Sequence, residues 1–197
     1  QIKERLMDSR YLYERGLYGQ FEDRMKEAKN MVQELEDKFT LLEINKEEQV
    51  ANHERKGHSK EYLAFLESLN LEREETLNAV LEELKYLDLY FQLSVEVLRE
   101  FVLKDDAKIE ALKAKVPEEL LNDNYSPKSA HAQKRYLQCK ALFHQLLGEN
   151  DKAHQNFSEV VQWWDEHKVY KQEEFFRYIN WENNKIISWR KCCSKCI

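Results

Sequence analysis

The residues with the clearest chemical potential are the cysteines near the C-terminus. Cys193 and Cys196 form a Cys-x-x-Cys pair directly after Cys192, and thiolates at this spacing bind zinc or exchange disulfides. A structural zinc site takes four ligands, however, and the sequence has no second Cys-x-x-Cys pair and no close histidine pair to complete the set. Cys139 stands alone in a helical pattern, where a free cysteine behaves as a small apolar residue. We therefore expect no metal site, and the role of the three C-terminal thiols stays open.

The histidines and acidic residues do not form a complete catalytic constellation. None of the six histidines has a glutamate three residues before it, as di-iron helical bundles require. His53 and His58 flank Gly57, and Asp151 shares a helix face with His154, but two ligands alone are more typical of a turn and a helix cap. The sequence lacks a phosphate loop, a Gly-x-Ser-x-Gly elbow and a His-Glu-x-x-His helix. It therefore predicts a protein that is not an enzyme and needs no cofactor.

The composition predicts an all-α fold. The 197 residues include only four glycines and two prolines, too few for the many turns of a strand-rich protein. Charged residues make up 35% and hydrophobic residues 42%, which is too apolar for a disordered chain, and no apolar run is long enough to span a membrane. The formal charge of −6 argues against a nucleic-acid partner, because phosphates require a basic surface. We expect a cytoplasmic protein.

One all-helical domain over residues 1–197 is the expected organisation. The chain begins on Gln1 inside a helical pattern, so we expect a fragment of a longer protein, and what lies upstream of Gln1 is not defined. The longest irregular stretch, LLNDNYSPKS, allows a subdivision into 1–121 and 126–192, with Pro127 in the first turn of the next helix.

The helical periodicity gives the expected elements. A capping-box spacing at Asn45 and Glu48 predicts one helix start, and the apolar stripe over 72–104 fits either one helix or two joined near Asp88. Because residues 84–103 are apolar on nearly every face, we expect them to form the core. The four tryptophans and neighbouring aromatic residues are expected to pack between the last helices. Helices are expected at about 1–16, 20–42, 45–57, 59–69, 72–104, 105–115, 127–147, 151–167 and 169–192.

Residues 134 to 167 carry a spacing of small and aromatic residues that suits two closely packed antiparallel helices. Ala141 lies in the first helix, Gly148 at the turn, and Ala153 and Phe157 in the second helix. This segment resembles one tetratricopeptide repeat (TPR), whose second helix places an alanine four residues before an aromatic residue. The segment departs from the family pattern at Leu137, Lys140, His144 and Asp165. A second, fainter likeness lies around Gly19 and Phe21.

The resemblance implies a TPR-like α-solenoid, an array of antiparallel helical hairpins, here with an irregular long-helix centre. It also implies a non-enzymatic scaffold that binds a protein or peptide, as a module of a larger regulatory protein. By helical geometry and resemblance, the partner-binding residues are Arg135, Gln138, Leu142 and Gln145. The alternative is a structural helical bundle that acts through self-association, for example as a homodimer.

Overall fold

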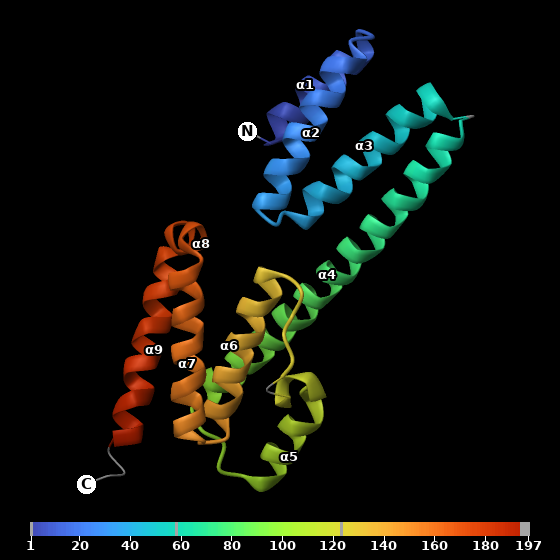
Figure 1. Ribbon diagram of the computed structural model, residues 1–197. Helices are drawn as coiled ribbons and strands as arrows, with labels where there is room; N and C mark the ends of the chain where they lie inside the picture. Colours follow the sequence, from blue (N-terminus) through green and yellow to red (C-terminus); the bar gives the residue numbers. More distant parts are fainter. Residues whose placement is uncertain (1, 58, 123, 194–197) are drawn as a thin grey trace. The chain divides into compact units, whose positions relative to one another are not determined.

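The computed structural model describes residues 2–57, 59–122 and 124–193. Within these residues all regular elements are helical, so the all-α prediction is confirmed. Figure 1 labels the α-helices in chain order. The α-helices are α1 (Ile2–Glu14), α2 (Tyr18–Glu34), α3 (Lys38–Lys56), α4 (Lys60–Arg99), α5 (Asp106–Lys115), α6 (Ala130–Leu146), α7 (Asn150–Glu166), α8 (Lys168–Glu173) and α9 (Phe175–Cys193). A short 3-10 helix, η1 (Glu118–Leu121), follows α5.

The chain divides into two compact units, Gln1–Leu81 and Glu82–Ile197. The first unit contains α1, α2, α3 and the first part of α4, and the second contains the rest of α4 and all later helices. The division therefore falls inside α4, whereas the sequence suggested 121–126. Leu120 and Tyr136, on either side of that irregular stretch, belong to one apolar core.

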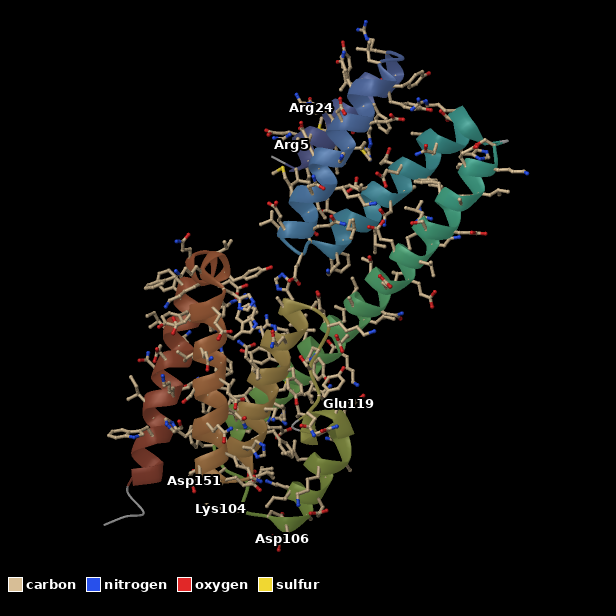
Figure 2. The ribbon with its side chains drawn as sticks, viewed as in Figure 1. Arg5, Arg24, Lys104, Asp106, Glu119 and Asp151 are labelled. Carbon is tan, nitrogen blue, oxygen red and sulfur yellow. The ribbon has the colours of Figure 1, made fainter. Side chains whose placement is uncertain are left out.

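The first unit is held by a mostly aliphatic core and by ion pairs between its helices. The helices α1 and α2 form a hairpin that turns at Gly16, whose φ of 73° favours glycine, and α3 packs against α2. Arg5 and Arg24 both bind the carboxylate of Glu27, and Figure 2 labels the two arginines. The core consists of Leu6, Phe21, Met25, Ala28, Val32, Leu41, Ile44 and Ala51.

The helix boundaries between α2 and α3 differ from those expected. Asp37 caps α3, because its side chain accepts a hydrogen bond of 3.0 Å from the backbone N–H of Thr40. The preceding residue, Glu36, has a φ of 50°, which ends α2 well before residue 42. Asn45 consequently lies inside α3 and is fully buried, so the capping box predicted there is wrong.

The helix α4 is continuous from Lys60 to Arg99, so the two helices expected at 59–69 and 72–104 form one helix. The helix is not interrupted near Asp88. Ser59 caps its first turn by accepting a hydrogen bond of 3.1 Å from the N–H of Tyr62. Asp88 is exposed, so a charged residue at this position does not interrupt the helix.

The second unit is built around α6 and α7, which Figure 1 shows side by side and antiparallel. They turn at Gly148, whose φ is 70° and where an added Cβ would lie 3.1 Å from a methyl group of Val102. The helix α9 packs on α7, and Tyr86, Leu89 and Leu93 of α4 join the same core. Three of the four tryptophans, Trp163, Trp164 and Trp181, are buried as expected, whereas Trp189 is exposed.

Two helix boundaries in the second unit follow from side-chain contacts that the periodicity did not reveal. The helix α6 starts at Ala130, not at Pro127, because the hydroxyl of Ser129 accepts a hydrogen bond of 3.1 Å from the N–H of Ala132. The expected helix 169–192 is interrupted at Glu174, whose carboxylate binds the ammonium group of Lys134 at 3.2 Å.

Candidate functional site

The four predicted partner-binding residues on α6 do not share one open face. Gln138 is 1% exposed and Leu142 is 6% exposed, because other parts of the second unit pack around this helix. The guanidinium group of Arg135 lies 4.8 Å from the ring centroid of Tyr90 and donates a hydrogen bond of 2.9 Å to Gln138. Gln145 is half-buried beside a small cavity. Gln138 and Leu142 thus lie inside the fold, and a partner-binding role for the set stays a prediction.

Lys134, one turn before Gln138, is enclosed by the protein's own aromatic rings. Its side chain is 3% exposed, and its Nζ lies 4.8 Å from the ring centroid of Trp164 and 5.4 Å from that of Trp163. Burial lowers the pKa of Lys134, while the charge of Glu174 acts in the opposite direction. Although burial raises the pKa of Glu174, the charges of Lys134 and Arg177 outweigh burial and hold it below the usual range. The aromatic enclosure therefore holds α6, α7 and the α8–α9 junction together.

A larger opening lies between the second part of α4 and α5. It has a volume of about 710 Å³, within the range of ligand and partner pockets. We call it the α4–α5 groove. Its deepest lining residues are the buried Leu89, Leu93, Leu103, Leu112 and Val116, and Phe91 and Val95 are exposed beside them.

Two backbone contacts position the walls of the α4–α5 groove. The N–H of Leu103 donates a hydrogen bond of 2.8 Å to the carbonyl of Leu146, which attaches the end of the α4–α5 connection to α6. Asp105 then caps α5 by accepting a hydrogen bond of 2.9 Å from the N–H of Ala107. Figure 2 labels Lys104 and Asp106 on either side of this cap.

Charged residues border the apolar part of the α4–α5 groove. Lys108 of α5 forms an ion pair with Glu100, and Arg99 lies 3.5 Å from Glu96. Lys115 also lines the groove. The groove is therefore apolar at its base and charged at its edge.

One face of α4 in the second unit is apolar and exposed, whereas the sequence led us to expect residues 84–103 to form the core. Phe91 is 57% exposed and Leu98 is 86% exposed. Together with Leu84, Asp88 and Val95 they recur at alternating intervals of four and three residues, which is the spacing of a coiled-coil seam. Only the opposite face, with Tyr86, Leu89 and Leu93, enters the core. We call residues 84, 88, 91, 95 and 98 the α4 stripe.

The sequence could have located the α4 stripe but not its exposure. The spacing of residues 84, 88, 91, 95 and 98 can be read from the sequence, but the opposite face of α4 is apolar as well. The sequence therefore does not show which of the two faces is buried, and only the packing of the helices decides this.

The candidate metal-ligand residues are not brought together in the described part of the chain, where no group of three or more such side chains converges. His154 Nδ1 lies 3.1 Å from the hydroxyl of Ser188, and Asp151 is exposed in the first turn of α7. His58, Cys196 and the thiols of Cys192 and Cys193 lie outside the description. Among the helices described, none combines the length and apolarity needed to cross a membrane.

Comparison with protein-family models, with curated proteins and with solved structures finds no match to the chain. A function must therefore be inferred from the surfaces of the protein itself.

Proposed function

We propose that this chain is a non-enzymatic helical module that binds a protein partner, and that the α4–α5 groove is its docking site. The observation that carries the proposal is the exposure of Phe91 and Val95 beside a base of buried leucines. A contiguous apolar surface bordered by charges is typical of protein-interaction sites, and a large aromatic side chain often provides much of their binding energy.

The partner that fits this groove best is an amphipathic helix. The walls are helices, and the groove presents an apolar base that a helix can cover with side chains at i, i+3, i+4 and i+7. The polar flanks of such a helix would lie beside the charged residues at the edge of the groove, which include Glu100, Lys108 and Lys115. Charged edges of this kind affect partner choice and association rate more than affinity.

The resemblance of residues 134–167 to a tetratricopeptide repeat supports the same functional class. Ala141, Ala153 and Phe157 are buried, and α6 and α7 are antiparallel neighbours, as a repeat of this family requires. We extend the proposal to a TPR-like solenoid with an irregular long-helix centre, acting as a module of a larger regulatory protein.

Self-association is the second candidate function, and the α4 stripe favours it. Two copies of a helix with apolar residues at coiled-coil spacing can bury them against each other. Asp88 lies within the stripe and disfavours this pairing, because a charge at a seam position must lose its hydration.

Substitution of Phe91 tests the proposed docking site. Proteins that co-purify with the tagged chain are isolated, and the affinity of each one for the chain is measured by isothermal titration calorimetry. We expect Phe91→Glu to weaken binding by at least about tenfold, since the new carboxylate would be desolvated in the groove. Phe39→Glu is the matched control, because Phe39 is an exposed phenylalanine of the first unit. A partner that binds both variants with wild-type affinity contradicts the docking site.

Sedimentation velocity of the purified chain separates the two candidates. Self-association predicts a dimer whose fraction rises with concentration and is lost in Leu98→Glu. A monomer at all concentrations leaves only the partner-binding function.

A further inference from the structure

The helix α9 has one face on the core of the second unit and an opposite face in solvent. It packs along α7, as Figure 1 shows. Trp181 and Ser188 lie on the packed face and are buried. Successive residues of an α-helix differ in direction by about 100°, which places the exposed large apolar residues of α9 on the other side. We call these residues the α9 outer face: Phe175, Phe176, Ile179, Ile186, Ile187 and Trp189.

The α9 outer face is a continuous apolar surface with aromatic residues at both ends. Its six residues fall within an arc of about 160° of the helix circumference. Phe176 is 86% exposed and Trp189 is 54% exposed, and the two are separated by about 20 Å along the helix. Single exposed apolar side chains are common on proteins, whereas a contiguous row of this length marks an interaction surface.

The charge of α9 is opposite in sign to that of the whole chain. The sequence of α9 contains four basic residues and one acidic residue, a formal charge of +3, in a chain of formal charge −6. The carboxylate of the acidic residue, Glu182, accepts a hydrogen bond of 3.0 Å from the hydroxyl of Tyr178. An anionic surface would therefore attract α9 and repel most of the remaining chain, which orients the outer face toward that surface.

The charge and the shape of α9 favour a lipid bilayer over a protein as the occupant of the outer face. Two copies of α9 would bring like charges together, which disfavours a dimer through this helix. A protein partner would have to provide an acidic groove for a convex helix face. A fluid bilayer with anionic headgroups accommodates one basic amphipathic helix that lies parallel to its surface.

The residue types of the outer face match the layer between lipid headgroups and hydrocarbon. Tryptophan and phenylalanine side chains concentrate at this layer in membrane proteins, and the isoleucines between them provide apolar area that can be buried. Asn183 lies on the same face and is exposed. A polar residue at this position favours shallow insertion at the level of the headgroups.

We propose that the α9 outer face binds the surface of a lipid bilayer that contains anionic phospholipids. The apolar residues of this face enter the headgroup layer, and the basic residues of α9 are attracted by the lipid phosphates and carboxylates. The inference goes beyond the proposed function, because it gives the module a second surface with a different kind of partner. A protein bound in the α4–α5 groove would then be held at a membrane.

Sedimentation of the full chain with lipid vesicles tests this proposal. One set of vesicles contains phosphatidylcholine and phosphatidylserine in equal amounts, and the other contains phosphatidylcholine alone. We expect binding to the first set, weakened by added salt, and little binding to the second. Phe176→Glu should lower the affinity by at least about tenfold, since it removes a buried phenyl ring and adds a negative charge. Phe39→Glu is the matched control, because Phe39 is an exposed phenylalanine of the first unit.

Tryptophan fluorescence shows whether α9 itself enters the headgroup layer. Trp189 is exposed, whereas the other three tryptophans of the chain are buried. Vesicles with phosphatidylserine should therefore shift the emission maximum to shorter wavelength. Trp189→Phe should retain binding and lose this shift.

Circular dichroism checks that each variant is folded, and Ile186→Glu is the second variant of the outer face should Phe176→Glu not fold. Three results overturn the proposal: no sedimentation with phosphatidylserine vesicles, equal binding to both sets of vesicles, or binding that is unchanged in both Phe176→Glu and Ile186→Glu. Phe91→Glu leaves vesicle binding unchanged, so the membrane surface and the α4–α5 docking site can fail separately.

Discussion

The two units of the chain are stabilised in different ways. In the apolar cluster of the first unit, as far as the structure describes it, Phe21 is the single fully buried aromatic residue. The core of the second unit contains three tryptophans, Trp163, Trp164 and Trp181. The charged groups differ as well, because Arg10 of the first unit binds Glu43 and Glu47 at the surface, whereas Lys134 of the second unit is enclosed.

The difference between the two units predicts which substitutions should lower the free energy of unfolding most. Exposed ion pairs contribute about 0–1 kcal/mol each, so the first unit depends on the burial of its aliphatic residues. Loss of one partner from an enclosed pair leaves a charge without hydration or a counter-ion, which costs considerably more. We therefore expect the second unit to be more sensitive to single substitutions.

The tryptophans also allow the units to be followed separately. All four lie in the second unit, at positions 163, 164, 181 and 189. Tryptophan fluorescence therefore reports on the second unit alone, while far-ultraviolet circular dichroism reports on both.

Substitution of Trp164 should produce the largest effect. Trp164 is fully buried, and we expect Trp164→Ala to lower the free energy of unfolding of the second unit by about 3–5 kcal/mol. Urea denaturation followed by fluorescence measures this. Trp189→Ala is the matched control, because Trp189 is exposed, and its effect should stay below about 1 kcal/mol. Equal effects of the two substitutions would contradict the interpretation that buried tryptophans stabilise the second unit.

Removal of the partner of Lys134 should produce an intermediate effect. Glu174 is partly exposed, so we expect Glu174→Ala to cost about 2 kcal/mol, less than the roughly 3–5 kcal/mol of a fully buried pair. The pKa of Glu174 is lowered in the folded protein. Its contribution is therefore present above its unfolded pKa and is lost as the pH falls through the lower folded pKa.

The difference in unfolding free energy between wild type and Glu174→Ala should accordingly shrink below about pH 4. Denaturation curves at pH 7 and at several lower values test this. Glu166→Ala serves as the control, because Glu166 is an exposed carboxylate of α7. A difference that does not change with pH would show that the ion pair is not its source.

Substitution of Asn45 should produce the smallest effect and one of opposite sign. Both polar atoms of its amide group are buried without a hydrogen-bond partner. We expect Asn45→Ala to raise the stability of the first unit by about 1 kcal/mol, since it removes the unpaired amide and favours the helix. Hydrogen exchange of the α3 amides measures this.

Asn52→Ala is the control in the same helix, because Asn52 donates a hydrogen bond of 2.9 Å to the carbonyl of Glu48. Destabilisation by Asn45→Ala would indicate that the amide of Asn45 is satisfied by water.

Sequence patterns predicted those features of the fold that depend on residues close in the chain. The turn at Gly148 and the caps at Ser59 and Asp105 lie where the residue types favour them. The capping box at Asn45 and the helix start at Pro127 were wrong, because Asp37 and Ser129 provide better caps nearby. Such competition between neighbouring caps is not resolved by spacing alone.

The candidate sites were less accessible to prediction. Helical period places Arg135, Gln138 and Leu142 on one face of α6, but it does not show that other elements cover that face. The burial of Gln138 and the exposure of Phe91 depend on helices that are distant in sequence.

The sequence by itself determined that this chain is helical, where its main turns lie and which side chains share a helix face. These features follow from backbone propensities and from the period of one helix, both of which are local. Only the tertiary structure decided that Lys134 and Gln138 are buried and that the α4 stripe is exposed. The physical reason is that burial depends on which helices meet, and many pairings of the same amphipathic helices satisfy the same local pattern.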